Sequence, residues 1–142
     1  MFLCALTLVL GMVGTASAVP YTWTDTYHNG PIYFSGSNNI GVQSYSFTHD
    51  ITDNGFDPGE DQVTSYGISM GLFDDGGDRS EWVYIDLPGL RSDRIIEIDY
   101  SNINLGMSFI GWIQLNTYGF LDITLNRLSG DFWFANSTLT AH

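Results

Sequence analysis

From about residue 20 onward, hydrophobic and polar residues alternate with a period of two, and turn residues recur at roughly 8- to 12-residue intervals. The clearest segment is 120–128, where Leu121, Ile123 and Leu125 alternate with polar residues. Such alternation is typical of strands that bury one face. It predicts further strands over 43–49, 63–73, 81–87, 94–100, 107–115 and 131–140, with an edge strand within 21–34.

This arrangement predicts an all-β fold, an antiparallel, jelly-roll-like β-sandwich of about seven to nine strands. No segment shows the 3.6-residue period of an amphipathic helix, so we expect no helix of useful length. The chain has no internal repeat and no linker composition, which indicates a single domain.

Residues 1–18 have the pattern of a secretory signal peptide. An apolar run over 3–13 precedes Ala16-Ser17-Ala18, which fits the small-residue cleavage pattern. The run is too short to cross a bilayer, so we expect the sandwich domain over 19–142, with no membrane span in the mature chain. The single cysteine, Cys4, lies within the signal, so the exported domain is expected to fold without a disulfide.

The chain carries 16 acidic residues against 4 arginines, a formal net charge of -12. Nucleic acids and anionic lipids both require a positive field, so neither is expected as a partner. Most of the acidic residues are Asp, which is unfavourable in strands and common in turns and metal sites. The negative charge should therefore concentrate in loops.

The densest acidic segment is 50–61, where carboxylate and amide oxygens crowd around two glycines. Hard oxygen donors on a tight turn suit Ca2+, and the spacing partly fits the EF-hand loop, although the flanks read as strands. The hypothesis is a calcium site with ligands from Asp50, Asp53, Asn54, Asp57 and Asp61 and a backbone carbonyl near Phe56. The alternative is an Asx-rich turn whose side chains cap its own backbone.

A second acidic cluster contains Asp74, Asp75, Asp78 and Glu81 around Gly76-Gly77. Paired glycines favour a tight hairpin, so we interpret this segment as a plain turn.

Enzymatic signals are weak. Gly67-Ile68-Ser69-Met70-Gly71 matches the nucleophile-elbow pattern, but it lies within an alternating segment and not between a strand and a helix. His28 and His49 have no nucleophile placed beside them in the sequence. We therefore expect a protein that is not an enzyme, and a hydrolase remains a minor alternative.

Trp82, Tyr84, Trp112 and Trp133 admit two interpretations. Large aromatic residues mostly fill the core of a sandwich. If some of them lie on an outer face, they form a platform for sugar rings, which favours a carbohydrate-binding module.

Four motifs carry a resemblance to a known group of proteins: Tyr45-Ser-Phe-Thr-His49-Asp50-Ile-Thr, Gly55-Phe56-Asp57-Pro58-Gly59 with Asp61, Leu72-Phe-Asp74-Asp75, and Gly130-Asp131-Phe132-Trp-Phe134-Ala-Asn-Ser137-Thr138-Leu139. They resemble a domain of exported bacterial proteins that often carry a PEP-CTERM sorting signal, and the likeness covers most of residues 21–142. It implies a β-sandwich exported by Gram-negative, exopolysaccharide-producing bacteria. The Pro-Glu-Pro motif and basic tail of the sorting signal do not occur up to His142.

Together these observations predict a secreted, calcium-stabilised domain with a structural or adhesive role at a bacterial cell surface or in an exopolysaccharide matrix. Extracellular polysaccharide or other surface proteins would be its partners.

Overall fold

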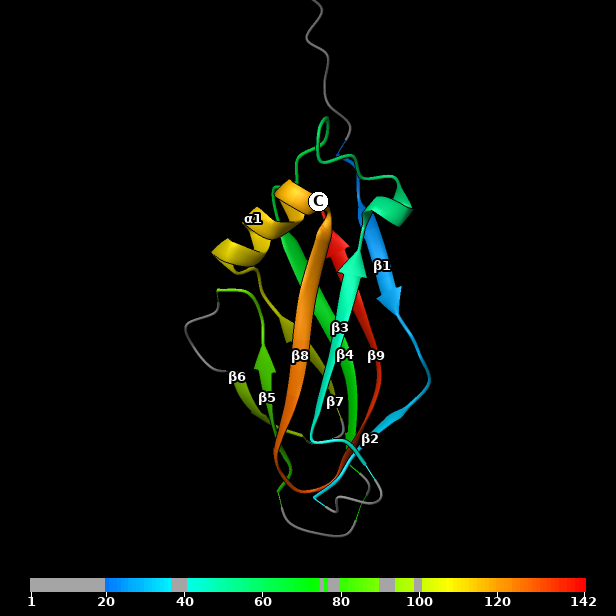
Figure 1. The fold of residues 1–142 in the computed structure, drawn as a ribbon, viewed down its shortest axis with the longest axis vertical. Coiled ribbons are helices and arrows are strands. Elements are labelled where there is room, and N and C mark those ends of the chain that lie inside the picture. The colour runs from blue at the N-terminus through cyan, green and yellow to red at the C-terminus, as the bar shows by residue number, and fades with distance from the viewer. Residues whose placement is uncertain (1–19, 37–40, 75, 77–79, 90–93, 99–100) are drawn as a thin grey trace, which may run out of the picture.

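The computed structural model describes residues 20–36, 41–74, 76, 80–89, 94–98 and 101–142. Within these ranges it contains nine strands, one α-helix and one short 3-10 turn, arranged as two antiparallel sheets packed face to face (Figure 1).

The first sheet has five strands. β1 (Trp23–Tyr27), β9 (Phe132–Ala141), β4 (Tyr66–Asp74) and β7 (Ser101–Leu105) lie in that order, and the short β2 (Ile32–Phe34) also pairs with β9. The second sheet has the order β3 (Ser44–Asp50), β8 (Phe120–Ser129), β5 (Trp82–Asp86) and β6 (Arg94–Glu97). Apart from β2, the chain crosses between the sheets in the order expected for a jelly roll, so the predicted fold class is confirmed.

The core lies between the sheets and follows the predicted alternation. Leu121, Ile123 and Leu125 of β8 are buried, as are Val83 and Ile85 of β5. Aromatic rings join the two layers: the Phe47 ring of β3 stacks on Phe134 of β9, with centroids 5.1 Å apart. Burying these inner faces supplies most of the favourable free energy of folding, because hydrophobic stabilisation scales with the apolar area removed from water.

The predicted strand over 107–115 is wrong, and so is the expectation that the chain has no helix of useful length. The chain instead forms β7 at 101–105 and then a helix, α1 (Phe109–Tyr118). Ser108 is its N-cap, with Oγ accepting a hydrogen bond from the Gly111 amide at 3.0 Å. Gly119 ends it at φ 77°, where a side chain would be strained. The two caps favour a helix here although the sequence between them has no helical period. Three apolar side chains of this helix, those of Phe109, Ile110 and Ile113, are exposed.

The helix is seated on the sandwich through a small polar cluster. The Ser108 amide donates to the Tyr66 hydroxyl at 3.0 Å, and Ser108 Oγ donates to the Pro88 carbonyl at 2.6 Å. The helical end of the molecule, as we call it, comprises α1, the 3-10 turn η1 (Thr52–Asn54) and the C-terminus (Figure 1).

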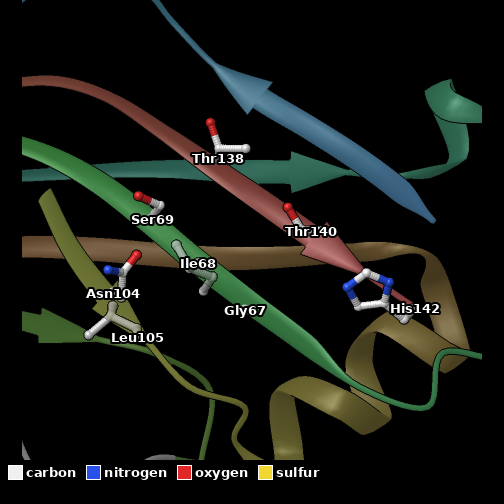
Figure 2. Close-up of a pocket in the computed structure, with 8 residues that line it drawn as sticks. All are labelled: Gly67, Ile68, Ser69, Asn104, Leu105, Thr138, Thr140 and His142. Atoms are coloured by element: carbon white, nitrogen blue, oxygen red, sulfur yellow. The ribbon is translucent and has the colours of Figure 1, made fainter.

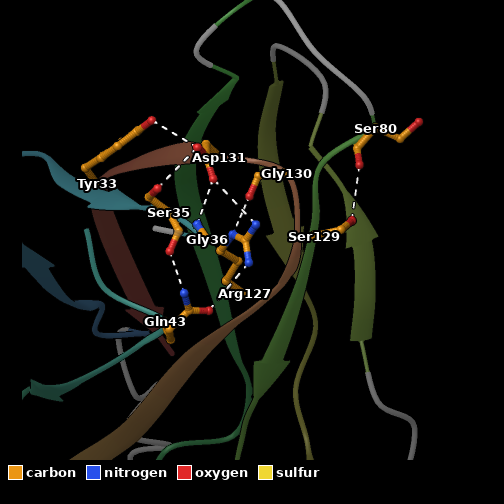
Figure 3. A network of polar contacts seen from close by, with 9 residues as sticks. All are labelled: Tyr33, Ser35, Gly36, Gln43, Ser80, Arg127, Ser129, Gly130 and Asp131. Carbon is orange, nitrogen blue, oxygen red and sulfur yellow. Dashed lines mark hydrogen bonds and ion pairs between the residues drawn. The ribbon is translucent and has the colours of Figure 1, made fainter. Parts of the chain in front are cut away.

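The opposite end of the sandwich is closed by a network around Asp131 (Figure 3). Its carboxylate accepts hydrogen bonds from the Gly36 amide at 2.9 Å and the Ser35 hydroxyl at 3.2 Å, and Arg127 lies 3.5 Å away. The pKa of Asp131 is lowered, first by the Gly36 hydrogen bond and then by the Ser35, Arg127 and Tyr33 contacts, partly offset by desolvation. The network joins the turn after β2 to the β8–β9 hairpin.

No helix within the described ranges combines the length and apolarity that a membrane crossing requires.

The seating of α1 generates a prediction for Gly111→Ala. An added Cβ would overlap the Tyr66 hydroxyl and lie 2.7 Å from Ser108 Oγ. We expect the free energy of unfolding to fall by about 1–3 kcal/mol, although alanine is intrinsically better than glycine in a helix by about 1 kcal/mol. Chemical denaturation measures the change. Gly106→Ala, whose Cβ would meet nothing within 4 Å, serves as the control. A stabilised Gly111→Ala protein would contradict this packing.

Candidate functional site

The acidic loop 50–61 is held by its own side chains. Asp50 Oδ1 accepts hydrogen bonds from the Thr52 amide at 2.9 Å and the Thr52 hydroxyl at 2.6 Å. Asp57 Oδ1 accepts from the Gly59 amide at 2.8 Å, and Asp61 Oδ2 accepts from the Asp57 amide at 2.9 Å. The Asp50 and Asp57 contacts are Asx turns, and all three carboxylates cap the backbone of their own loop, as in the alternative interpretation.

The other expected calcium ligands, at Asp53, Asn54 and Phe56, lie in different environments. Asp53 and Asn54 are exposed in η1. Phe56, near which a backbone carbonyl was the expected ligand, buries its ring in the core, edge-on to Trp23 with centroids 5.0 Å apart. Within the described residues, which include this whole loop, no three His, Cys, Asp or Glu side chains gather where they could hold a metal ion. Calcium binding would therefore require these side chains to move together around the ion, and it stays a prediction.

Half of the second acidic cluster lies outside the described residues, which include Asp74, Gly76 and Glu81 but not Asp75 or Asp78. Asp74 Oδ1 accepts a hydrogen bond from the Gly76 amide at 2.5 Å, and Gly76 has a φ of 74°. Both features are those of a tight turn.

A polar triad that the sequence did not reveal lies between the sheets. His49 of β3 contacts Asp25 of β1 through Nδ1 (2.7 Å to Oδ2) and Ser137 of β9 through Nε2 (2.8 Å to Oγ). These are the residue types and contacts of a Ser-His-Asp catalytic triad. However, Ser137 and His49 are both 0% exposed, so no substrate reaches the hydroxyl. The triad instead ties three strands from two sheets together.

Burial governs the ionisation of this triad. The pKa of His49 is lowered from its usual value of 6.5 because desolvation penalises the imidazolium, and the Asp25 carboxylate offsets only part of that effect. The neutral ring is therefore favoured in the folded protein.

One sequence signal could have located His49. It follows Tyr45 and Phe47 at a spacing of two, which places it on the inner face of β3. A strand-parity argument therefore predicts a buried histidine, which needs polar partners.

The middle of the outer face of the five-stranded sheet carries neutral polar side chains. One row runs across four strands through Thr26, Thr138, Ser69 and Asn104, and a parallel row runs through Thr24, Thr140 and Gly67. The Thr26 and Thr138 hydroxyls lie 3.1 Å apart. Over these rows lies a shallow depression of about 240 Å³, lined by the residues in Figure 2, which include His142 at one end.

Further along β4 and β9, away from the helical end, the same face becomes aromatic. Trp133 is paired in register with Tyr33 on one side and Phe73 on the other. The Tyr33 and Trp133 ring centroids lie 4.6 Å apart, and Trp133 and Phe73 are 38% and 37% exposed. Four residues of β4 separate Phe73 from Ser69, or about 13 Å at 3.3 Å per residue.

The other aromatic candidates are less available. Trp82 and Tyr84 are half-buried in β5. Trp112, on α1, packs against the core, and its indole N–H donates to the Val63 carbonyl at 2.7 Å. Trp133 is therefore the predicted platform residue that the fold leaves most open, on the outer face of the five-stranded sheet.

The remaining enzymatic candidates do not assemble. Ser69 lies in the middle of β4, in extended backbone and not at the sharp turn that a nucleophile elbow requires. His28 is exposed. Asp86 and Asp122 line an opening on the four-stranded sheet, but both are exposed, whereas a glycosidase acid needs an apolar environment to stay protonated.

Comparison with protein families, with characterised proteins and with solved structures finds no match for this chain. The resemblance noted in the sequence therefore stays a prediction.

The calcium hypothesis gives the first prediction for this region. If the loop binds Ca2+, chelation by EDTA lowers the melting temperature, and Asp57→Ala removes the difference between the calcium-loaded and chelated protein. Differential scanning fluorimetry measures both. Asp122→Ala, an exposed carboxylate in β8, should keep the difference. A melting temperature that is the same with and without EDTA would support the self-capped turn instead.

His49 generates a second prediction. The unfolded chain takes up a proton more readily than the folded one, so the free energy of unfolding should fall as the pH drops below about 6.5, by at most about 1.4 kcal/mol per pH unit. Stability recovers as the pH rises through this window. Denaturation between pH 5 and 8 measures the slope.

Replacing His49 by Gln should remove this slope, whereas replacing the exposed His28 by Gln should preserve it. Asp131 does not contribute to the slope between pH 5 and 8, because its pKa is lowered from its usual value of 3.8 and the carboxylate stays ionised over that range. An equal slope in wild type and His49→Gln would show that His49 does not titrate as described.

Proposed function

We propose that this protein is an exported, non-catalytic glycan-binding domain that holds a polysaccharide chain against the outer face of its five-stranded sheet. One observation carries the proposal: Trp133 lies on an open sheet face, and rows of neutral hydroxyl and amide groups lie further along the same face. Its role would be adhesive or structural, in the surface layer or exopolysaccharide matrix of a Gram-negative bacterium.

The aromatic end supplies the apolar part of such a site. A sugar ring has faces of C–H groups, and stacking them on an indole removes apolar surface from water without a conformational change. The Tyr33 ring contacts the indole of Trp133 at an interplanar angle of 35° and restrains it, so little side-chain entropy is lost on binding.

The polar end supplies hydrogen bonds. Ser, Thr and Asn side chains can both donate and accept, as the hydroxyl groups of sugars do. The row of Thr138, Ser69 and Asn104 comes from three adjacent strands, so its spacing is set by backbone pairing. Rigid strands hold such groups more precisely than loops do.

The distance between the aromatic part and the polar part of this face determines how long a ligand must be to contact both. About 13 Å separates the rows of Phe73 and Ser69, which an oligosaccharide spans and a monosaccharide does not. Jelly rolls include lectin domains, but many unrelated functions share this fold, so the proposal rests on the face and not on the architecture.

The test is Trp133→Ala against a panel of glucose, N-acetylglucosamine and xylose hexamers, with affinity measured by calorimetry and by tryptophan fluorescence. We expect at least one hexamer to bind and its affinity to fall about tenfold, which corresponds to about 1.4 kcal/mol of lost stacking.

Trp82→Ala, in the four-stranded sheet, is the matched control and should bind as wild type does. Ser69→Ala combined with Thr138→Ala should weaken the same hexamer from the polar end. Equal binding by wild type and Trp133→Ala, or no binding to any neutral hexamer, would sink the proposal.

A further inference from the structure

A second opening adjoins the proposed glycan face, at the helical end. It is a cleft of about 430 Å³ between the start of β1, the end of the acidic loop and the C-terminus, and Tyr21, Trp23, Glu60, Asp61 and His142 contribute to its walls. An adjacent space of about 360 Å³ shares Tyr21, Trp23 and Asp61. We call the two together the Trp23 cleft.

One wall of the Trp23 cleft is aromatic. Tyr21 is 60% exposed, and its ring centroid lies 5.0 Å from that of Trp23. Trp23 is only 6% exposed and is fixed from behind by the edge-on contact with Phe56. The wall is therefore a rigid indole with a phenol ring open to a ligand.

The indole also carries an unused donor. Trp23 Nε1 is buried and has no hydrogen-bond acceptor among the described residues. Leaving a buried donor unsatisfied costs about 1–3 kcal/mol. The N–H has almost no surface of its own, so a ligand oxygen would reach it only by moving the exposed ring of Tyr21, which lies against the indole. An oxygen that did so would recover that free energy, so the donor indicates a ligand with hydroxyl or ring oxygens.

The facing wall is acidic. Asp61 is half-buried and its position is set by the hydrogen bond from the Asp57 amide to Oδ2, while Glu60 is exposed beside it. Neither of the two arginines in the described ranges, Arg94 and Arg127, lines the cleft. Carboxylates opposite aromatic rings favour a cation, through ion pairing and through the negative ring faces.

The Trp23 cleft is continuous with the proposed glycan face. His142 lines both the cleft and the depression of Figure 2, and its Nδ1 lies 3.0 Å from the Thr22 hydroxyl. The His142 amide donates to the Ser65 carbonyl at 2.8 Å, which fixes the residue between the two openings. A chain lying along β4 and β9 could therefore place a further sugar unit in the cleft.

We infer that the Trp23 cleft binds a protonated amino sugar, so that the polysaccharide bound by this protein contains units with a free amine. The ammonium group pairs with Asp61 and Glu60, a sugar oxygen accepts from Trp23 Nε1, and the ring lies against Tyr21. This inference rests on the proposed function for the chain that leads into the cleft, and it adds the chemical class of the ligand.

The experiment compares hexamers of glucosamine, N-acetylglucosamine and glucose on the full-length protein at pH 6 and moderate salt, with EDTA present so that metal does not compete for Asp61. We expect the glucosamine hexamer to bind at least tenfold more tightly than the other two. Glu60→Gln combined with Asp61→Asn should remove that preference. Asp61→Asn keeps a side-chain oxygen that can accept from the Asp57 amide, and circular dichroism verifies the fold.

Two controls distinguish binding at the Trp23 cleft from general electrostatic attraction to the acidic protein. Asp53→Asn with Asp122→Asn removes the same amount of charge from exposed positions outside the cleft and should preserve the preference. Hexalysine, which carries charge without sugar oxygens, should bind more weakly than the glucosamine hexamer and should not respond to Tyr21→Ala. Equal loss in both double variants, or equal binding of hexalysine, would overturn the inference.

The outcomes also distinguish this inference from the proposed function. If neutral hexamers bind through Trp133 but glucosamine gains nothing, the glycan face stands and the cleft fails as an amino-sugar site. If glucosamine binds through Asp61 and Tyr21 but no hexamer responds to Trp133→Ala, the cleft stands and the extended glycan face fails.

Discussion

Every strand of this protein has two faces, and only one of them can be buried between the sheets. That constraint fixes the core, because the inward side chains of Phe47, Ile123 and Phe134 have no other apolar surface to meet, and each is at most 5% exposed. It also fixes the surface on which the proposed glycan site lies. Once the inner faces are sealed, the outer face of the five-stranded sheet is available to solvent, and its side chains are spaced by backbone pairing instead of by loops.

The alternation of residues was sufficient to predict the sandwich and most of its strands, because a period of two is dictated locally by the pleat. It failed at α1. The segment 109–118 contains apolar residues on all sides, and only Gly111 and Leu115 are buried, so no helical stripe marks it. The informative residues were Ser108 and Gly119, which cap the helix. In a short helix outside the main core, the capping residues determine whether the helix forms more than an apolar stripe along one side does.

The polar contacts were beyond sequence reasoning for a different reason. His49 meets Asp25 and Ser137, which lie 24 and 88 positions away, and only the crossing of the chain between sheets brings them together. Parity could place His49 inward, but it could not name its partners. The same holds for the Trp23 cleft, where Tyr21, Asp61 and His142 come from the two ends and the middle of the chain.

The acidic loop shows how one set of residues supports two chemistries that compete. As the structure stands, Asp50, Asp57 and Asp61 satisfy amide donors that would otherwise be unpaired in a tight turn. A calcium ion needs several of these oxygens to converge, and no three of these acidic side chains, all of them among the described residues, gather in the structure, whereas a single carboxylate is enough for an ammonium group. The ammonium group can pair with Asp61 while Oδ2 still accepts from the Asp57 amide, since a carboxylate has lone pairs for several donors. The loop geometry therefore favours a cation that approaches from the cleft over one enclosed by the loop.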